Sequence, residues 1–414
     1  MSSSVAVIKI DELIKLQNDK SKQVKSSDYS ASGILPIVDQ SASPICGYTN
    51  DLSKKYDKSL PIIIFGDHTL HTKFIDFDFA VGADGTQIIV PRKEKCDAKY
   101  LYFLIFRAAN LLGSEGYKRH LNILRKCEIE YIPDFNEQQK IAAILTTIDQ
   151  AIEKTEALIE KYQHIKAGLM HDLFTRGIGA DGKLRPPREQ APELYQHTPI
   201  GWIPRDWDFG SISSIMESIT DGPFGSNLKT EHYVIDLGVR VIRLQNIQAM
   251  SYNDNDRAYV SDKHAAFLLR NKVLSGDILI AGLGEDRYPV GRACLYPDNL
   301  PPAINKADCF RLRCKVDEAE NLFVMFYLNT EYARIQIRKY EQGVTRPRIN
   351  TGNFKKLIIP KPSINEQKII TDQLMTVAEK IEIENKRNQK FKMEKSGLMH
   401  DLLTGKVQVK INNT

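Results

Sequence analysis

Apolar residues recur at alternating steps of three and four positions in two long stretches of the chain. This spacing forms a heptad seam along one face of an α-helix, and such a seam needs a partner helix to cover it. No proline or glycine interrupts either stretch before Gly168 or Gly397. The pattern predicts two long helices within 135–178 and 363–407. Their seam residues are Ile141, Leu145, Ile148, Ile152, Thr155, Ile159 and Tyr162 in the first helix, and Ile370, Leu374, Val377, Ile381, Glu384, Asn388 and Phe391 in the second.

The two stretches are copies of one sequence. "NEQQKI" at 136 matches "NEQKII" at 365, and the hexapeptide "GLMHDL" occurs at 168 and again at 397. Both pairs are separated by 229 residues, so the sequence between them is in register without a gap. Asn136 and Asn365 are the expected N-caps, each followed by a glutamate that suits the positive end of the helix dipole. A repeat of this length indicates an internally duplicated chain.

The hexapeptide is expected to close each helix. Its glycine should loosen the last turn, and its Leu and Met side chains should pack on a neighbouring domain. His171 and His400 occupy equivalent places within it. A histidine near a helix C-terminus is more often a capping or packing residue than a metal ligand or a catalytic group.

The nearest partner for each seam is the other copy. About 35 residues at about 1.5 Å per residue make a rod of about 50 Å. An antiparallel coiled coil would carry one block of chain at each of its ends, related by an approximate two-fold axis. The polar Glu384 and Asn388 would set its register. Two unrelated amphipathic helices, each packed on its own domain, remain the alternative.

The blocks that precede the helices, 1–134 and 205–362, are expected to be mixed α/β domains dominated by sheet, which makes the chain α+β. Their strand signals are "SLPIIIFGD", "GTQIIVPR", "VRVIRLQNI", "GDILIAG" and "DCFRLRC". The segment 179–204, rich in glycine and proline, is expected to be a linker and the entry to the second domain. Residues 408–414 would form a tail.

Composition narrows the function only weakly. The chain of 414 residues holds 57 basic and 52 acidic residues, so its net charge of +5 permits nucleic-acid binding without demanding it. The six scattered cysteines lack the paired spacing of a zinc site, which predicts reduced thiols. No basic start followed by an apolar run opens the chain, and its apolar runs are too short to cross a bilayer. We expect a cytoplasmic protein with no membrane partner.

Motifs for catalysis are missing from the sequence. There is no GxxxxGK[ST] loop for ATP, and no glycine-rich methyl-donor turn followed by an Asn-Pro-Pro-aromatic tetrapeptide. "PDFNEQQK" is similar to the acidic–lysine pattern of restriction nucleases, but Glu137 and Lys140 stand at helical spacing inside the repeat. His68 and His71 lack further ligands for zinc. We expect no catalytic residue, no metal and no cofactor in this chain.

What remains is a set of polar loops rich in hydrogen-bond donors. Arg, Lys, Asn and Gln match base edges in the major groove, while Ser, Thr and backbone amides hold phosphates. For each residue alone, a solvated turn is the commoner interpretation. Arg119 and Arg346 occupy matching places in "GYKRHLN" and "GVTRPRIN". The candidate DNA-binding residues are His68, Thr69, His71, Lys73, Thr86, Arg92, Arg119, Ser226, Asn227, Lys229, Arg243, Gln245, Asn246, Arg287, Arg346 and Arg348.

The duplicated frame resembles the DNA-specificity subunit of type I restriction–modification systems over essentially the whole chain. The similarity rests on 136–178 and 365–407, with weaker support from "IIIFGDHT", "VGADGT", "GDILIAGLGE" and "GVTRPRIN". It implies two target-recognition domains, each reading one half of a bipartite DNA site, held apart by the helices. The first block is shorter than the second, which departs from strict symmetry.

The resemblance also implies partners. Two modification subunits, which carry S-adenosylmethionine and methylate adenine, would dock on the helices. Two restriction subunits with ATP and Mg²⁺ would complete a nuclease that acts on double-stranded DNA, and this chain would supply specificity without chemistry. Two other functions stay open: a coiled-coil adaptor that does not read DNA, and a fused DNA methyltransferase or nuclease.

Overall fold

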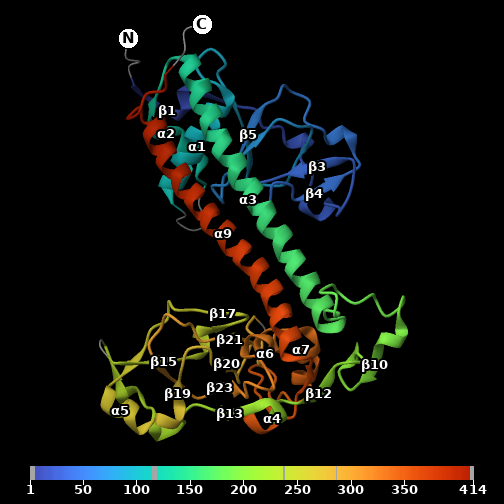
Figure 1. Ribbon diagram of the computed structural model, residues 1–414. Helices are drawn as coiled ribbons and strands as arrows, with labels where there is room; N and C mark the ends of the chain where they lie inside the picture. The colour runs from blue at the N-terminus through green and yellow to red at the C-terminus, as the bar shows by residue number, and fades with distance from the viewer. Residues whose placement is uncertain (1–4, 114–118, 236–237, 286, 411–414) are drawn as a thin grey trace. The chain divides into compact units, whose positions relative to one another are not determined.

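The computed structural model describes the chain except for residues 1–4, 114–118, 236–237, 286 and 411–414. Its backbone divides into two compact units: unit 1 comprises 1–159 with 384–414, and unit 2 comprises 160–383. The division passes through two long helices, α3 (Phe135–Thr175) and α9 (Ile364–Leu403). Each unit therefore contains part of both helices, which Figure 1 draws in green and red.

Unit 1 contains a four-stranded antiparallel sheet, a smaller sheet and two short helices. The sheet order is β2-β8-β5-β6, the smaller sheet is β4-β3-β7, and β1 pairs with β9. Among the described residues of this unit, only β3 and β7 run parallel. The elements are β1 (Ala6–Lys9), β2 (Ile14–Leu16), β3 (Leu35–Val38), β4 (Gly47–Thr49), β5 (Ile62–Gly66), β6 (Thr72–Ile75), β7 (Ala80–Val81), β8 (Thr86–Pro91), α1 (Ala98–Leu112), α2 (Leu121–Lys126) and β9 (Glu128–Tyr131).

Unit 2 has a larger set of strands and short helices. Its four-stranded antiparallel sheet has the order β13-β23-β20-β21, and its second sheet has the order β14-β18-β15-β22-β19. The elements are β10 (Tyr195–Thr198), β11 (Gly201–Pro204), β12 (Asp208–Ser211), α4 (Ile212–Ile215), β13 (Met216–Thr220), β14 (Tyr233–Val234), β15 (Val239–Ile242), β16 (Ile247–Gln248), β17 (Ser251–Tyr252), β18 (Tyr259–Val260), α5 (Asp262–Phe267), β19 (Lys272–Val273), β20 (Ile278–Ala281), β21 (Ala293–Leu295), β22 (Ala303–Asn305), β23 (Cys309–Cys314), α6 (Asn321–Leu328), α7 (Glu331–Arg338), α8 (Thr351–Phe354) and β24 (Ile358–Lys361).

The two units follow one topological plan. In each, the four-stranded sheet is antiparallel and the second sheet contains one parallel pair, β3 with β7 in unit 1 and β15 with β22 in unit 2. In each, the first strand of the predicted block (1–134 or 205–362) pairs with the strand just before a long helix, β1 with β9 and β12 with β24. The duplication read from the helical repeat therefore extends through the blocks, whose sequences have diverged.

The central strands explain how one run of apolar residues supports two cores. Successive side chains of a strand point to opposite faces of the sheet. In β5, Ile63 and Phe65 join the core beneath α1, while Ile62 and Ile64 join a separate cluster on the other face. The same alternation divides β20 between two clusters. Continuous apolar strands are typical of sheets that are buried on both faces.

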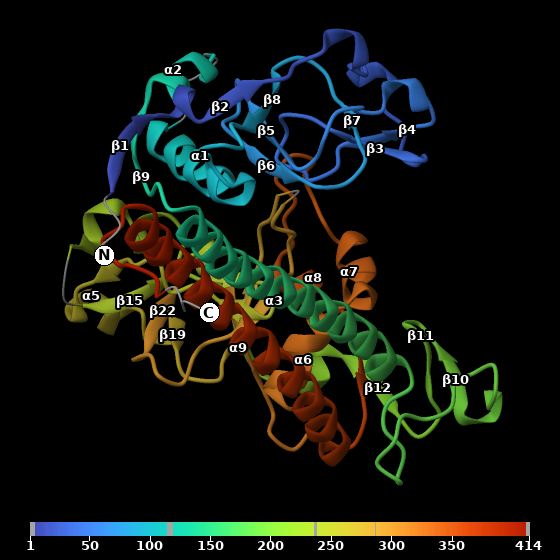
Figure 2. The ribbon, with the colours of Figure 1, turned by 90° about the horizontal axis from the view of Figure 1, so that it is seen from above.

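Helix α1 covers one face of the unit 1 sheet. Its start is capped by Asp97, whose carboxylate accepts the backbone N–H groups of Lys99 and Tyr100, both at 2.9 Å. Its buried stripe includes Leu101 and Leu104, which face the sheet core. Figure 2 shows α1 lying along β5 and β6.

The long helices begin two residues earlier than the predicted asparagine caps require. The side chain of Asp134 accepts the N–H of Glu137 at 2.8 Å, and the hydroxyl of Ser363 accepts the N–H of Glu366 at 3.2 Å. Asn136 and Asn365 lie inside the first turn. The prediction was wrong because it assigned the cap from residue type and overlooked the equally suitable residues just before.

The hexapeptide lies in the last turns of each helix and its Leu and Met side chains pack in the cores, as expected, but its glycine does not interrupt the helix. Gly168 and Gly397 lie inside α3 and α9, which continue to Thr175 and Leu403. A glycine inside a helix costs about 1 kcal/mol relative to alanine, which the burial of the following turns outweighs. Those turns bury the residues Met170, Leu173 and Phe174 in the core of unit 2, and Met399, Leu402 and Leu403 in the core of unit 1.

Each core also receives the start of the other long helix. Ile141 and Leu145 of α3 are fully buried in unit 1, and Ile370 and Leu374 of α9 in unit 2. The remaining predicted seam residues are buried or partly buried: Ile148, Ile152, Thr155, Ile159, Tyr162, Val377, Ile381, Glu384, Asn388 and Phe391. Both cores are thus completed by one helix start and one helix end.

Within unit 1 the two helix segments run antiparallel. Lys395 lies 2.5 Å from Asp149, and Lys392 lies 2.8 Å from Glu156. Asn388 donates to the same Glu156 carboxylate at 3.3 Å. The residue numbers rise on α3 as they fall on α9, which fixes the direction of this pairing inside the unit.

The segment predicted as a linker is folded against unit 2. It contains the hairpin of β10 and β11, and Tyr195 within it is buried. Arg185 lies 2.7 Å from Glu366, which also accepts the N–H of Ile178 at 2.7 Å. Both charged side chains are almost buried, so this ion pair joins the chain that follows α3 to the first turn of α9.

No helix in the described part of the chain combines the length and the apolar character that crossing a membrane requires.

Candidate nucleic-acid interface

Three loops of unit 1 meet at one point. The N–H of Asp67, just after β5, donates to the carbonyl of Gly85 at 2.8 Å. The N–H of His120, just before α2, donates to the carbonyl of Asp67 at 2.8 Å. The Asp67 carboxylate also accepts the N–H of Leu121 at 2.8 Å. Backbone hydrogen bonds therefore hold the loop after β5, the turn before β8 and the loop before α2 together.

The same three loops meet in unit 2. The N–H of Gly282, just after β20, donates to the carbonyl of Asp308 at 2.7 Å. The N–H of Ile349, in the loop before α8, donates to the carbonyl of Gly282 at 2.9 Å. Each unit thus presents one cluster of three polar loops, which we call its loop cluster. Some of the predicted DNA-binding residues of the chain lie in these clusters, and others do not.

Hydrogen-bond partners correct one predicted correspondence. His120 and Ile349 make the same backbone hydrogen bond in their own units, so the residues before them, Arg119 and Arg348, are equivalent. The sequence comparison aligned Arg119 with Arg346 instead. That alignment used an offset of 227 residues, whereas the hydrogen-bond register pairs Arg119 with Arg348 at an offset of 229, the same as in the helical repeat.

In unit 1, His68, Thr69 and His71 lie in the loop cluster. The Thr69 hydroxyl donates to the carbonyl of Gln40 at 2.5 Å, and the N–H of His68 donates to the Gln40 side chain at 3.2 Å. Gln40 in turn donates to the carbonyl of Asp84 at 2.8 Å. Gln40 therefore ties the loop after β3 to the cluster, a role that its place in the sequence did not reveal.

The predicted DNA-binding residues Lys73, which is partly buried, and Thr86, which is buried, form hydrogen bonds inside the fold. The ammonium of Lys73 donates to the carbonyls of Asp39 at 2.8 Å and Ser43 at 2.5 Å, and burial lowers its pKa. Thr86 is only 2% exposed, and its hydroxyl donates to the carbonyl of Ala83 at 2.8 Å. A buried hydroxyl with an internal partner cannot reach DNA, so the prediction for Thr86 is wrong.

Arg119 belongs to the loop cluster of unit 1, whereas Arg92 does not. Arg119 is exposed and adjoins His120 in the loop cluster. Arg92 follows the far end of β8, whose residues span about 20 Å at about 3.3 Å each. Arg92 therefore lies outside the loop cluster of unit 1.

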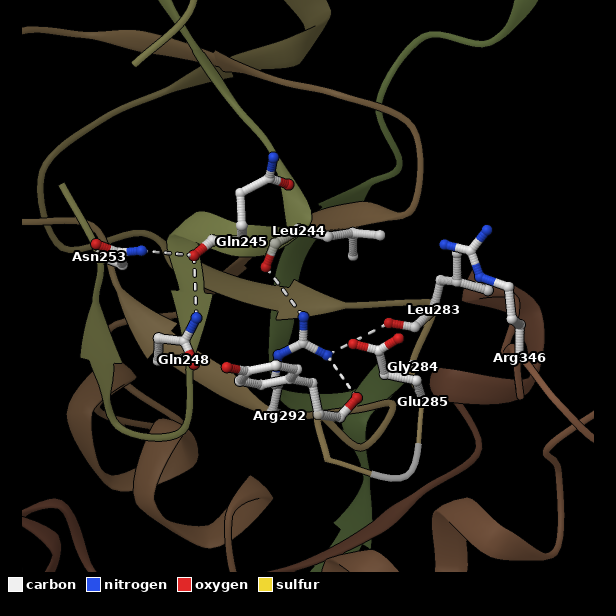
Figure 3. Close-up of a pocket in the computed structure, with 10 residues that line it drawn as sticks. Leu244, Gln245, Gln248, Asn253, Leu283, Gly284, Glu285, Arg292 and Arg346 are labelled. Carbon is white, nitrogen blue, oxygen red and sulfur yellow. Dashed lines mark hydrogen bonds between the residues drawn. The ribbon is translucent and has the colours of Figure 1, made fainter. Parts of the chain in front are cut away.

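In unit 2 the loop cluster borders an open pocket of about 320 Å³. Figure 3 shows the side-chain amide of Gln245 and the guanidinium of Arg346 directed to the same side, away from Arg292. Both residues are exposed. The pocket is lined by Leu244, Gln245, Gln248, Asn253, Leu283, Gly284, Glu285, Tyr288, Arg292 and Arg346.

Arg292 forms the floor of this pocket. Its guanidinium donates to the carbonyls of Ile247 at 2.7 Å, Leu244 at 3.0 Å and Tyr288 at 3.0 Å. Burial lowers the pKa of the guanidinium. Arg292 therefore clamps the loop after β15 to the loop after β20. Sequence reasoning missed it, together with the pocket residues Gln248, Asn253 and Glu285, because no local motif marks them.

Arg243 and Asn246 also prove to be internal supports. Arg243 donates to the carboxylate of Asp256 at 2.8 Å. Asn246 is fully buried, donates to the carbonyls of Asn253 and Asp256 at 2.8 Å each, and accepts the N–H of Arg243. The prediction that Asn246 contacts a base is wrong, since its polar atoms bond to the turn that interrupts the predicted strand "VRVIRLQNI" after Ile242.

The glycine-rich loop after β13 presents Ser226, Asn227 and Lys229 to solvent. The carbonyl of Asn227 lies 2.9 Å from a ring nitrogen of His264, and the ammonium of Lys229 lies 3.6 Å from Glu231. These residues border α5 and not the pocket. The start of the loop still reaches the loop cluster, because Phe224 contacts Arg348 and the Asp221 carboxylate accepts the N–H of Asp308 at 2.9 Å.

The remaining predicted arginines of unit 2 are exposed at the loop cluster. Arg287 lies over the ring of Tyr288 at 5.5 Å. Arg348 forms an ion pair with Asp308 at 2.6 Å. Arg346 lines the pocket, and all three arginines present guanidinium donors, which suit base edges and phosphates. The described residues contain no group of three or more His, Cys, Asp or Glu side chains placed to hold a metal ion.

Comparisons with known proteins agree with one another. Residues 2–161 and 204–393 match the family described as type I restriction modification DNA specificity domain. The chain is 26% identical over 340 residues to the type I restriction enzyme MjaVIII specificity subunit of Methanocaldococcus jannaschii, covering 78% of this chain and 74% of that one. It is 25% identical over 336 residues to the putative MjaX specificity subunit of the same organism, covering 78% and 71%.

Solved structures share the fold. A type I restriction–modification system S subunit from M. genitalium superposes with a TM-score of 0.63 at 15% identity, covering 97% of this chain and 96% of that one. At this identity the likeness speaks for the two-domain fold of mixed helices and strands.

Proposed function

The chain belongs to the family of type I restriction–modification DNA specificity domains, and on that premise we propose that each of its units reads one half of a bipartite DNA site. It is a specificity subunit of a type I restriction–modification system. The observation that carries the proposal is the repeated loop cluster: two units of one topology present the same three loops with different side chains. A protein that reads two different half-sites needs this combination of a shared frame and divergent loops.

The helices α3 and α9 would form the spacer. Their 41 and 40 residues would give an antiparallel coiled coil of about 60 Å at about 1.5 Å per residue, with the units related by an approximate two-fold axis. The heptad seams, the antiparallel ion pairs inside unit 1 and the matching use of helix starts and ends in both cores support this arrangement. The length of the helices would then set the number of unread base pairs between the half-sites.

The partners follow from the family. Two modification subunits that bind S-adenosylmethionine and methylate adenine would dock on the helices, and two restriction subunits with ATP and Mg²⁺ would complete the nuclease on double-stranded DNA. This chain would supply no catalytic residue and hold no cofactor of its own, acting in the cytoplasm of a bacterium or archaeon. Neither an adaptor without DNA contact nor a fused methyltransferase or nuclease is favoured by its relatives.

Exchange of one unit tests the proposal. Residues 1–134 are replaced by the corresponding block of a relative with a different site, keeping the buried α3 residues Ile141 and Leu145. Methylated adenines are then mapped in cells that carry the modification subunits. One half of the methylated sequence should change and the other should stay, while an unchanged site, or a change in both halves, would contradict independent reading by the two units.

A further inference from the structure

One turn of unit 2 holds a side chain in a backbone conformation that normally belongs to glycine. Asp308, in the turn before β23, has a φ of +65°. The equivalent turn of unit 1 has Gly85 at this place, with a φ of +85°. The equivalence follows from the hydrogen bond that each carbonyl accepts, from Gly282 in unit 2 and from Asp67 in unit 1. A left-handed aspartate where glycine would serve indicates that its carboxylate has a use.

The surroundings hold Asp308 firmly in this conformation. Its N–H donates to the carboxylate of Asp221 at 2.9 Å, and its carbonyl accepts the N–H of Gly282 at 2.7 Å. Gly222, beside Asp221, lies so close to the backbone of Lys306 that a side chain there would collide with it. The turn is therefore fixed on both sides, which fixes the point where the Asp308 side chain leaves the backbone.

The Asp308 carboxylate lies next to Arg348. A carboxylate oxygen of Asp308 lies 2.6 Å from Nη2 of Arg348, with the aspartate side chain 17% exposed and the arginine 47% exposed. The guanidinium also lies 5.2 Å from the ring of Phe224. The backbone of Arg348 exchanges two hydrogen bonds of 2.9 Å with Gln342. Carboxylate, ring and backbone together orient a half-exposed guanidinium before any ligand arrives.

We infer that Arg348 is a specificity-determining residue of unit 2 that reads a guanine, and that Asp308 is its positioning residue. This inference rests on the proposed reading of DNA by the loop clusters. A guanidinium is a planar fork of five N–H donors, and the ion pair uses Nη2, so donors remain for the O6 and N7 acceptors of guanine.

The ion pair itself favours a base over a phosphate. The negative charge of Asp308 offsets the positive charge of Arg348, which weakens attraction to the phosphate backbone. Hydrogen bonds to the neutral edge of guanine depend on the direction of the donors more than on net charge. An oriented guanidinium whose charge is balanced by a carboxylate therefore suits contact with a base. An arginine without such a partner suits contact with a base or with a phosphate.

Unit 1 keeps the equivalent arginine but has no aspartate at the equivalent position of the turn. Arg119 takes the place of Arg348, but Gly85 takes the place of Asp308 and offers no carboxylate. The two units therefore orient equivalent arginines differently. Replacing Asp308 by glycine converts the unit 2 turn to that of unit 1, and glycine suits the backbone at this position, so the variant should fold.

The test measures base preference in the complex with modification subunits. Competitive binding to DNA duplexes that vary one position at a time in each half-site is compared for the native chain and for Arg348→Ala, Arg348→Lys and Asp308→Gly. Arg338→Ala serves as the control, since Arg338 forms an exposed ion pair with Glu331 on α7. Arg348→Ala should lower the preference for guanine at one position of the unit 2 half-site by about tenfold or more.

The other variants separate the roles. Arg348→Lys keeps the charge but not the fork, so it should lose the preference too. Asp308→Gly should reduce the same preference while overall folding and the unit 1 half-site stay unchanged. An equal loss of affinity for every sequence, or a guanine preference that survives Arg348→Ala, would overturn the inference. A native complex without preference in either half-site would instead overturn the proposed function.

Discussion

The hydrogen bonds that attach the start of each long helix to its unit are alike in the two units, whereas the loop clusters differ. In unit 1, Gln138 accepts the N–H of Asp97 at 2.8 Å and donates to the carbonyls of Lys95 and Ile132 at 3.1 and 2.8 Å. In unit 2, its repeat partner Gln367 makes the same three bonds to Glu320, Glu318 and Pro362, at 2.9, 3.3 and 3.0 Å. The duplicated sequence therefore encodes a duplicated connection.

The loop clusters have diverged around a common backbone scheme. Unit 1 uses Gly85 and a three-stranded second sheet, whereas unit 2 uses Asp308, a five-stranded second sheet and a pocket floored by Arg292. The difference teaches that the parts fixing a unit to its helices tolerate little change, while the parts facing a ligand are free to vary. The predictions below test this separation.

Truncation of the paired core leucines should have the largest effect. Leu145→Ala and Leu374→Ala each remove a fully buried side chain at equivalent places of the repeat. Each should lower the free energy of unfolding of its own unit by about 2–5 kcal/mol, because the packed core leaves a cavity. Native-state hydrogen exchange resolved by peptide shows which unit is affected, with the exposed Lys154→Ala and Glu379→Ala as controls. Equal loss of protection in both units after either change would show that the cores are not separate.

Loss of the hydrogen bonds of Gln138 and Gln367 should have the second-largest effect on stability. Gln138→Ala and Gln367→Ala leave buried donors and acceptors without partners, and each should destabilise its unit by about 1–3 kcal/mol. Similar losses of stability in the two variants would support the equivalence of the two helix attachments. Denaturant unfolding followed by unit-specific exchange measures them, and Gln139→Ala, an exposed neighbour, is the matched control. An attachment that tolerates alanine in one unit only would break the equivalence.

The left-handed position before β23 in unit 2 accommodates a side chain, whereas the equivalent position before β8 in unit 1 should not. Gly85→Ala places a Cβ 2.5 Å from the side chain of Gln40 in a conformation that suits glycine, and should destabilise unit 1 by about 1–2 kcal/mol. Unit 2 already accommodates Asp308 at this position. Thermal unfolding checks the result. An unchanged midpoint in Gly85→Ala would mean that the turn adapts, and the contrast with Asp308 would lose its weight.

The smallest expected effect concerns Asp221, which supports the Asp308 turn. Burial raises the pKa of its carboxyl to about 6, so the folded state keeps a proton that the unfolded state releases near the ordinary value of 3.8. The contribution of Asp221 to stability is therefore full below about pH 4 and is lost as the pH rises to about 6. Relative to Asp221→Asn, the native chain should lose thermal stability between about pH 4 and about pH 6 and then stay level. A constant difference between the two proteins would contradict the raised pKa.

The sequence reveals the helices better than the loops. Heptad spacing located the seam residues from Ile141 to Phe391 because one stripe of a helix must be buried, and that requirement leaves a periodic signal. The caps failed because Asn136 and Asp134 are equally suited by type. Residues such as Thr86 and Asn246 are polar for internal reasons, and composition cannot separate an internal hydrogen bond from a surface donor. Arg292 and Gln40 act through long-range contacts, which leave no local pattern.

The central claim is that the length of α3 and α9 sets the gap between the two half-sites. Lengthening both helices together tests this claim most directly. Seven residues are inserted after Ile159 in α3 and seven after Ile383 in α9, which preserves the heptad seam and adds about 10 Å. In cells with the modification subunits, mapping of methylated adenines should show both half-sites unchanged and the gap between them longer by about three base pairs of about 3.4 Å each. Insertion into α3 alone, which breaks the seam register, is the control and should abolish methylation. Methylation at the original spacing by the doubly extended chain would contradict the account.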